Sequence, residues 1–290
     1  MESVMTRTTV FIVTILLAMT PASTYGREPV SENSITEHNP WEKYSLSLGG
    51  YITEMNTELR YGGKGLGFDI DAEEILNLDS NTFTYRIDAH WRFSENRRHR
   101  WDLRIISLHR NGSRSILRDI EVEGPNGNII EIPAGTGVES YFDLDIYQTS
   151  YSYSFFQDDR IDLGAITGLY IMPINLGLNA TGLVEANERE KFIAPLPSFG
   201  LRADFAITPN VFLRSRSQVF YVKLDSFKGF LTEQHFAVEY LPTKYFGMGI
   251  GYDVFRLGIE SDGEDYPNID LKGNIEFEYG AFMLYGKIYL

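Results

Sequence analysis

The stretch TFTYRIDAHWRFS, residues 82–94, decides the fold because its apolar and polar residues alternate without a break. Successive side chains of a β-strand point to opposite faces, so this stretch gives one apolar face and one largely charged face. The apolar face carries Phe83, Tyr85, Ile87, Ala89, Trp91 and Phe93, and the opposite face carries Thr84, Arg86, Asp88, His90 and Arg92. The pattern predicts a β-strand whose two faces meet different surroundings.

The same period of two recurs along the rest of the chain. It is present in 199–205, 211–221, 235–240 and 246–254, where aromatic and aliphatic residues alternate with glycine, arginine and carboxylates. The 26 glycines, 18 tyrosines and 19 phenylalanines fit a chain made mostly of strands and turns. The sequence therefore predicts an all-β fold.

Composition excludes several classes of protein. The chain has 290 residues and no cysteine, which removes disulfide frameworks, thiol nucleophiles, thiolate zinc sites and iron–sulfur clusters. A formal net charge of −14 argues against binding to nucleic acid, because neutralising phosphates needs a concentrated basic face. We therefore expect no nucleic-acid partner, no metal and no bound cofactor.

The N-terminal region divides into two segments. Arg7 precedes a short apolar run at 10–19, and small or helix-breaking residues follow as far as Gly26. This is the pattern of a secretory signal peptide, and the run is about half as long as the ~20 residues of a spanning helix. Residues 27–43 are polar and without period. The sequence predicts a signal peptide at 1–26, with an uncleaved anchor as the weaker alternative, a periplasmic tether at 27–43 and the folded domain at 44–290.

Two folds can use strands with one apolar and one polar face. In a soluble sandwich the apolar face is the dry core, whereas in an outer-membrane barrel the apolar face meets lipid and the polar face lines the interior. Aromatic residues near strand ends, such as Phe93, Trp101 and Tyr240, favour the barrel because interfacial girdles are aromatic. Arginine and aspartate on one face also suit paired charges in a lumen.

The lengths of the connections give the same answer. Short connections at 95–99, 157–159, 208–209 and 242–244 alternate with long ones at 61–81, 111–140, 179–190 and 260–268. We predict a transmembrane antiparallel up-and-down β-barrel of about ten strands, with short periplasmic turns and long extracellular loops. The predicted strands are 44–60, 82–94, 100–110, 141–155, 160–177, 192–206, 210–223, 229–241, 245–259 and 268–290.

The last predicted strand is unusually long and changes phase. Its apolar residues lie at 275, 277 and 279 on one face and at 282, 284 and 288 on the other. A bulge near Gly280 would restore one continuous strand. The alternative is a tight hairpin at Gly280 plus another strand within 61–81, which would give twelve strands.

These features together resemble a Gram-negative outer-membrane β-barrel protein, and most closely the small barrels such as the OmpA transmembrane domain and the OmpW-like proteins. The resemblance rests on the signal peptide, the alternating strands and the last strand, which ends YGKIYL at 285–290. Barrels of this family usually end in an aromatic residue, whereas here Leu290 follows Tyr289. The resemblance implies an outer-membrane location, with lipid, lipopolysaccharide and the barrel-insertion machinery as partners.

The polar faces predict which charges line the lumen. The inward set comprises Arg86, Asp88, His90, Arg92, Asp102, Arg104, Asp162, Arg202, Asp204, Arg214, Arg216, Glu233, Glu239, Asp253, Glu276 and Glu278. Opposite charges in a confined interior should pair, because an unpaired buried charge is costly. The network could then plug the lumen, or its charges could tune a narrow channel.

An apolar vestibule is a second possibility near the long loops. It would be lined by Phe142, Leu144, Ile146, Ile166, Tyr170 and Met172, which keep the phase of inward polar residues. A bulge at Pro173 or around Tyr147 would instead turn these side chains toward lipid.

Three functions follow from these observations. The first is a structural barrel or a narrow channel for small solutes, without enzymatic activity. The second is an OmpW-like uptake channel for small hydrophobic molecules. The third is an outer-leaflet lipid hydrolase, for which His109 with the nearby Ser113 is the candidate. We predict no catalytic residue, because a histidine near a serine in sequence is common.

Overall fold

The computed structural model describes residues 40–61, 68–71, 80–115, 119–123, 129–180, 188–223, 227–262 and 272–289. The expected signal peptide at 1–26 and most of the expected tether lie outside these described residues. Every regular element in them is a β-strand, and they contain no helix able to cross a membrane.

The described part of the chain forms thirteen strands. They are β1 (Tyr44–Tyr61), β2 (Phe68–Asp71), β3 (Asn81–Arg92), β4 (His99–Ser115), β5 (Ile120–Glu123), β6 (Ile129–Ile132), β7 (Gly137–Gln157), β8 (Ile161–Ala180), β9 (Glu188–Thr208), β10 (Val211–Lys223), β11 (Phe227–Tyr240), β12 (Phe246–Asp262) and β13 (Lys272–Tyr289). Three of them, β2, β5 and β6, are only 4 residues long.

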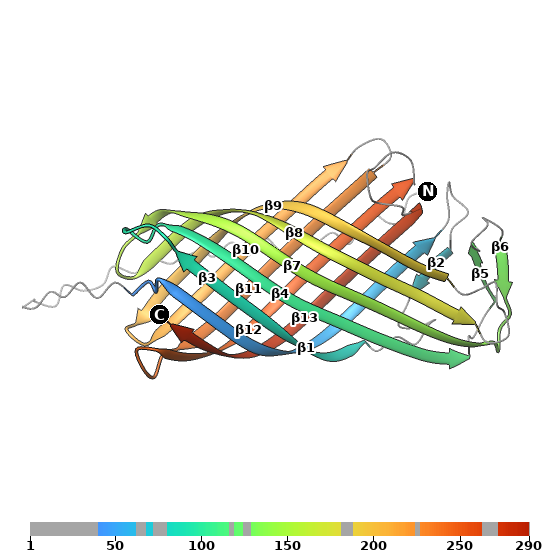
Figure 1. Cartoon of the computed structure of the whole chain (residues 1–290), viewed down its shortest axis with the longest axis horizontal. Helices are drawn as coiled ribbons and strands as arrows, with labels where there is room; N and C mark the ends of the chain where they lie inside the picture. The colour runs from blue at the N-terminus through green and yellow to red at the C-terminus, as the bar shows by residue number, and fades with distance from the viewer. Residues whose placement is uncertain are drawn as a thin grey trace, which may run out of the picture. The chain divides into compact units, whose positions relative to one another are not determined.

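The ten long strands form a closed ring (Figure 1). Each pairs antiparallel with the next long strand of the chain, and β13 then pairs with β1 from Ser45↔Tyr289 to Tyr61↔Gly273. β2 pairs with the last residues of β1, and β5 and β6 form a separate hairpin. The predicted ten-strand barrel is confirmed. The twelve-strand alternative is wrong, because no turn interrupts β13.

The two ends of the barrel differ in their connections. At one end, which we call the turn end, the strands are joined by residues 93–98, 158–160, 209–210 and 241–245. At the other, the loop end, the connections are 62–80, 116–136, 181–187, 224–226 and 263–271. The predicted alternation of short and long connections is confirmed, although 224–226 is a short connection at the loop end.

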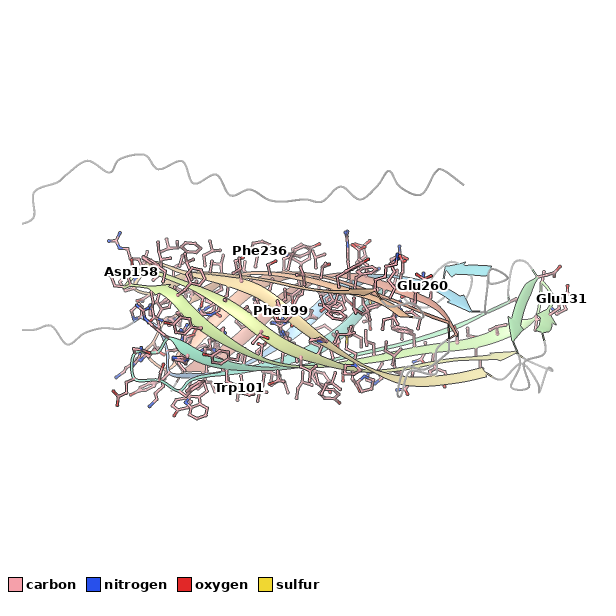
Figure 2. The ribbon with its side chains drawn as sticks, turned by 90° about the horizontal axis from the view of Figure 1, so that it is seen from above. Trp101, Glu131, Asp158, Phe199, Phe236 and Glu260 are labelled. Carbon is pink, nitrogen blue, oxygen red and sulfur yellow. The ribbon has the colours of Figure 1, made fainter. Side chains whose placement is uncertain are left out.

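The outer wall of the turn-end half is a band of apolar side chains, which we call the lipid belt. Phe83 is 75% exposed and Phe282 is 69% exposed, although residues of this kind are normally buried. Figure 2 shows Trp101, Phe199 and Phe236 projecting from this wall. A continuous band of this kind is stable against hydrocarbon. Its members include Leu46, Leu48, Ile52, Phe83, Leu103, Phe199, Leu201, Val219, Phe236, Val238, Ile250, Phe282 and Leu284.

Aromatic rings gather at the turn-end edge of the lipid belt. Tyr44 stacks on Trp91 with the ring centroids 6.1 Å apart, and Phe93 meets Trp91 edge-on at 5.6 Å. His99 Nδ1 lies 2.7 Å from the Tyr151 hydroxyl. Rings with a polar tip prefer the boundary between membrane and water. The cluster therefore marks one edge of the membrane.

Toward the loop end, the polarity of the two faces of the wall is reversed, so that the inner face is apolar and the outer face is polar. On β13, Phe282 and Leu284 point outward within the lipid belt. Further along the same strand, Phe277 and Tyr279 are buried inside the barrel while Glu278 points outward. This reversal indicates that water rather than hydrocarbon surrounds the wall at this level, because polar side chains face outward there.

This exchange corrects two expectations about β13. The strand keeps one register with β1 and with β12 along its whole length, so the predicted bulge near Gly280 is wrong. The inward placement of Glu276 and Glu278 is also wrong, because both lie on the outer face. The apolar residues move from the outer to the inner face of β13 because the medium around the wall changes. The backbone pairing continues without a shift.

Candidate functional site

Charged side chains fill the interior of the turn-end half, and we call them the ionic network. Its cations are Arg86, Arg92, Arg100, Arg104, Arg202, Arg214, Arg216 and Lys287, and its carboxylates are Glu42, Asp88, Asp102, Asp162, Asp204, Glu233, Glu239 and Asp253. Of the sixteen residues expected to line the lumen, the structure places all but Glu276 and Glu278 on the inner wall, with His90 and His235 among the charges.

Asp162 on β8 is the centre of the network nearest the turn end. Its Oδ2 accepts hydrogen bonds from Arg92 Nη1 at 2.7 Å and from Arg202 Nη1 at 2.9 Å. Arg202 Nη2 also donates to Oδ1 at 3.2 Å. A Cβ on Gly164 would lie 2.8 Å from Arg202 Nε. Glycine at this position therefore leaves room for the guanidinium that reaches Asp162.

Asp253 on β12 is a second centre, closer to the loop end. Arg86 Nη1 lies 2.5 Å from its Oδ2, and His235 Nδ1 lies 2.5 Å from its Oδ1. Tyr51 of β1 donates its hydroxyl hydrogen to the same carboxylate. Arg86 also binds Asp88 of its own strand, so these contacts connect β3 with β12, two strands that β1 and β13 separate in the ring.

Glu233 on β11 joins the ionic network to the residues above it. Arg104 of β4 forms an ion pair with Glu233, and the Tyr170 hydroxyl of β8 donates to it. Gln148 Nε2 donates in turn to the Tyr170 oxygen at 2.9 Å. Charged and polar side chains therefore cross the lumen from wall to wall.

Trp41 lies inside the turn end of the barrel, just before β1. The residue is 1% exposed, and its Nε1 donates to the Asp158 carbonyl at 2.7 Å. Its ring meets Phe212 edge-on at 6.3 Å, and the Arg92 guanidinium lies 5.8 Å from the ring. The segment expected to be a tether at 27–43 therefore ends in a docked side chain.

Glu42 lies beside Trp41, and we call this pair of residues the stopper. Glu42 Oε1 accepts hydrogen bonds from Arg214 Nη2 at 2.7 Å and from Lys287 Nζ at 3.1 Å. Burial opposes the ionisation of Glu42, but the charges of Arg214 and Lys287 outweigh it and hold its pKa well below the usual 4.5. The stopper therefore carries a charge that the ionic network neutralises.

Sequence reasoning missed the stopper, Arg100 and Lys287. A tryptophan followed by a carboxylate directly before the first strand, within an otherwise polar segment, was the available signal for the stopper. Lys287 alternates with the outward Ile288, so its phase alone indicated an inward side chain.

The interior of the loop-end half is mainly apolar, although the buried Arg110 guanidinium lies 4.9 Å from the Phe142 ring. We call the apolar side chains there the upper apolar cluster. The six residues considered for a vestibule all face inward with at most 6% exposure, and five of them belong to this cluster. Phe142 stacks on Phe277 at 5.6 Å, and Phe255 stacks on Tyr279 at 5.3 Å. The expected apolar lining is therefore present, but its side chains pack against one another.

The register of β7 and β8 explains why these residues face inward. The pairing is the same from Val138↔Ala180 to Ser154↔Gly164, so no bulge occurs near Pro173 or Tyr147. The irregularity lies instead between Ser154 and Phe156, at the turn end. The alternative that sent the vestibule residues to lipid is therefore wrong.

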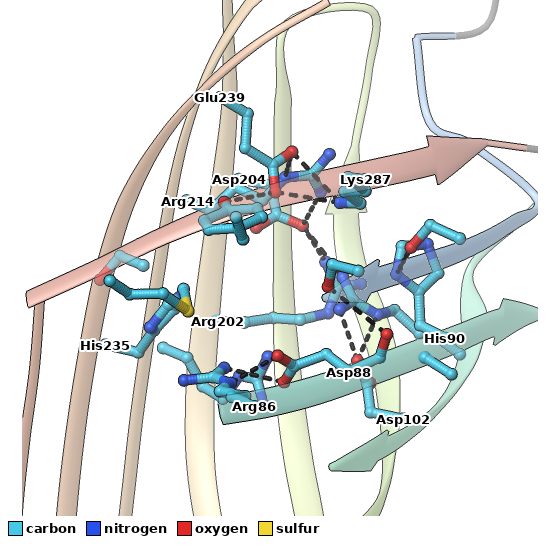
Figure 3. Close-up of a pocket in the computed structure, with 18 residues that line it drawn as sticks. Arg86, Asp88, His90, Asp102, Arg202, Asp204, Arg214, His235, Glu239 and Lys287 are labelled. Atoms are coloured by element: carbon cyan, nitrogen blue, oxygen red, sulfur yellow. Dashed lines mark hydrogen bonds and ion pairs between the residues drawn. The ribbon is translucent and has the colours of Figure 1, made fainter. Parts of the chain in front are cut away.

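A cavity of about 50 Å³ lies within the ionic network (Figure 3). Charged side chains from β3, β4, β9, β10, β11 and β13 surround it. A cavity of roughly 150 Å³ accommodates a benzene ring. The cavity therefore admits water or a monatomic ion but no organic solute.

The histidine considered for hydrolysis lies outside the barrel. His109 is exposed on the outer face of β4, opposite Asp143 of β7. Among the described residues it has no hydrogen bond or ion pair, whereas a hydrolytic site needs a nucleophile and an orienting acid in contact with its base. The described residues also contain no group of three or more histidine, aspartate or glutamate side chains that could hold a metal.

Comparison with known proteins finds likenesses among outer-membrane barrels. No protein-family model and no curated protein matches the chain. The outer membrane protease OmpT from Escherichia coli is 8% identical, with 85% of this chain and 96% of that chain covered and a TM-score of 0.46. The Ralstonia pickettii toluene transporter TbuX is 11% identical, with 87% and 92% covered and a TM-score of 0.33. Ail, the attachment invasion locus protein of Yersinia pestis, is 11% identical, with 86% and 100% covered and a TM-score of 0.33.

The geometry of the barrel itself defines its class. Its sheet closes on itself, its outer wall carries the lipid belt, and opposite charges pair inside it. This combination is the arrangement of transmembrane β-barrels. The chain is a β-barrel protein of the outer-membrane type.

Proposed function

We propose that the protein resides in the outer membrane of a Gram-negative bacterium as a structural barrel that conducts no solute. The proposal is supported by side chains that fill the interior at three levels. The stopper occupies the turn end, the ionic network occupies the part inside the lipid belt, and the upper apolar cluster occupies the part toward the loop end.

The ionic network is the observation that carries this proposal. The side chains of Arg92, Asp162 and Arg202 are at most 3% exposed. Arg92 of β3 reaches Asp162 of β8 past the two strands between them, and Arg202 of the neighbouring β9 binds the same carboxylate. Breaking one buried ion pair by removing a partner costs about 3–5 kcal/mol. A continuous aqueous path would separate several such pairs at once, so the closed state is strongly favoured.

With the lumen closed, the outer wall beyond the lipid belt and the loops remain for function. Short turns face the periplasm in such barrels, which puts the loop end outside the cell. The wall there is polar, with Arg256 Nη2 2.8 Å from Glu278 Oε1 in an exposed pair. We infer an anchor that presents this wall, with lipid and lipopolysaccharide around the belt and the insertion machinery as a partner during biogenesis. The proposal assigns no catalytic role.

Planar-bilayer recording tests the closed lumen. The protein is refolded in detergent, shown to be folded by its heat-dependent gel mobility, and shown by protease protection to be inserted in vesicles. Folded, inserted protein should give no unitary current steps. Reproducible steps of constant size from the same preparation would overturn the proposal and favour the narrow channel.

Uptake of small hydrophobic molecules is the second candidate, and the upper apolar cluster favours it. Repacking of Phe142, Phe255 and Phe277 would open an apolar path toward the loop end. Equilibrium binding of a radiolabelled monoaromatic hydrocarbon to the detergent-solubilised barrel tests this candidate. Saturable binding that Leu144→Arg abolishes would support uptake, whereas binding that equals the partition into empty detergent micelles would eliminate it.

A further inference from the structure

The wall of the cavity in the ionic network carries more positive than negative charge. Its cationic lining residues are Arg86, Arg100, Arg202, Arg214, Arg216 and Lys287. Its carboxylate lining residues are Asp88, Asp102, Asp204 and Glu239. The lining therefore has two more cations than carboxylates, and Asp253 and Glu42, which lie outside the lining, pair with Arg86 and Lys287.

Two of the cavity arginines stand directly opposite each other in the sheet. Arg202 of β9 and Arg216 of β10 are Cα partners, and His235 of β11 is the next residue in the same row. Like charges placed directly opposite each other repel. Asp162 and Asp204 neutralise Arg202, but Arg216 has no hydrogen bond or ion pair with any described residue.

A second arginine at the cavity has a donor without an acceptor. Arg214 Nη1 is buried and has no hydrogen-bond partner among the described residues, although it lies 3.5 Å from Asp204 Oδ2. The Arg214 side chain as a whole is 8% exposed. A buried N–H without an acceptor is costly, so an acceptor in the cavity would be stabilising.

The network carboxylates outside the lining form their ion pairs with cations other than Arg216, and Glu42 pairs with Arg214 and Lys287. Asp162 is paired with Arg92 at 2.7 Å, and Asp253 is paired with Arg86 at 2.5 Å. Glu233 is paired with Arg104. Water in the cavity would supply acceptor oxygens but no charge, whereas an anion supplies both the acceptor and the opposite charge.

We propose that this cavity binds one small inorganic anion of about the size of chloride, with Arg214 and Arg216 as its principal donors. The volume of about 50 Å³ excludes organic anions. A monatomic anion accepts hydrogen bonds from any direction, which suits donors that converge from separate strands. The bound anion completes the ionic network and stabilises the folded barrel, whether or not the barrel conducts.

Anion dependence of the unfolding temperature tests this site. The detergent-refolded protein is heated in sodium chloride and, separately, in sodium gluconate at the same ionic strength, since gluconate is too large for the cavity. Chloride should raise the midpoint by a few degrees, and the increase should saturate with concentration, because a ligand that binds only the folded state stabilises it by mass action. Equal midpoints in the two salts at every concentration would overturn the proposal.

Two variants and one diffraction measurement test whether the chloride-dependent rise of the unfolding midpoint comes from this cavity. Arg216→Gln should lose the difference between chloride and gluconate, whereas Arg256→Gln, which removes an exposed cation from the outer wall, should keep it. Crystals of the unaltered protein grown in bromide should show anomalous density inside the cavity, which needs no variant to fold. Anomalous density absent from the cavity, or a chloride effect that survives in Arg216→Gln, would each refute the site.

Discussion

Glu42 Oε1 accepts a hydrogen bond from Lys287 Nζ at 3.1 Å, so a residue just before the first strand is tied to the last strand inside the lumen. Arg214 of β10 binds the same oxygen at 2.7 Å. The backbone pairing of β1 with β13 closes the ring, and these side chains reinforce the closure from within. The stopper is therefore part of the barrel's closure.

Replacing Glu42 by glutamine should destabilise the barrel in a pH-dependent way. The neighbouring cations hold the pKa of Glu42 below its usual 4.5 in the folded state. A carboxyl with a lowered folded pKa contributes stability that is complete well above pH 4.5 and is lost as the pH falls through the folded pKa. The difference in unfolding midpoint between unaltered protein and Glu42→Gln should be full at neutral pH and shrink below pH 4.5.

Glu260→Gln is the matched control for this prediction. Glu260 Oε2 lies 3.6 Å from Lys228 Nζ on the exposed outer wall, where an ion pair contributes about 0–1 kcal/mol. Its midpoint should follow that of the unaltered protein at every pH. A Glu42→Gln difference that stays constant into acid would show that the carboxylate acts through packing and not through its charge.

Replacing Trp41 by alanine should open the turn end. Deleting a fully buried tryptophan side chain costs about 3–5 kcal/mol, because the surroundings relax only partly. The chain has no native cysteine, so a cysteine introduced at Ser45, which lines the cavity, reports access by its rate of reaction with a thiol reagent. Trp41→Ala should lower the unfolding midpoint and accelerate this labelling.

Trp101→Ala provides the comparison, since Trp101 is half-exposed on the outer wall. Trp101→Ala removes a large aromatic side chain that does not contact the stopper. In proteins that carry Ser45→Cys, the labelling rate should be the same with Trp101→Ala as with Trp101 intact. Equal acceleration by both tryptophan variants would mean that labelling follows general loosening, and the role of Trp41 at the mouth would be refuted.

Removing one buried cation should cost far more than removing an exposed one. Arg202→Met leaves Asp204 and Asp162 with fewer donors in a buried site, which should cost about 3–5 kcal/mol of unfolding free energy. Arg256→Met breaks the exposed pair with Glu278 and should cost at most about 1 kcal/mol. Urea titration of folding into lipid vesicles measures both, and similar costs would show that water screens the ionic network.

The fold was predictable because the membrane imposes a simple rule on each strand. Where lipid surrounds the wall, every second residue must be apolar, and residues 82–94 obey this rule without exception. The inward set of charges followed from the same alternation. The individual ion pairs could not be predicted from the alternation. Arg92 of β3 contacts Asp162 of β8 inside the lumen, and such a pair depends on how the strands are staggered around the ring.

The rule misled where the wall leaves the membrane. At Phe277 and Tyr279 the apolar residues lie inside and at Glu278 the polar residue lies outside, so alternation was correct but the assignment of faces was reversed. A period of two says that two faces differ and does not say which one is inward. The expected bulge near Gly280 arose from applying one assignment to the whole strand.

Charge substitutions on β13 should locate the edge of the membrane. Leu284 and Glu276 both point outward from this strand, but Leu284 belongs to the lipid belt and Glu276 lies on the polar wall beyond it. Leu284→Arg should cost about 2–4 kcal/mol, because it exposes a charge to hydrocarbon. Glu276→Arg should change stability by only about 0.5 kcal/mol, since its side chain remains in water.

Urea titration of folding into vesicles measures both values. Equal, large costs would place Glu276 in hydrocarbon, and the exchange of inner and outer faces would then need a cause other than the end of the lipid belt.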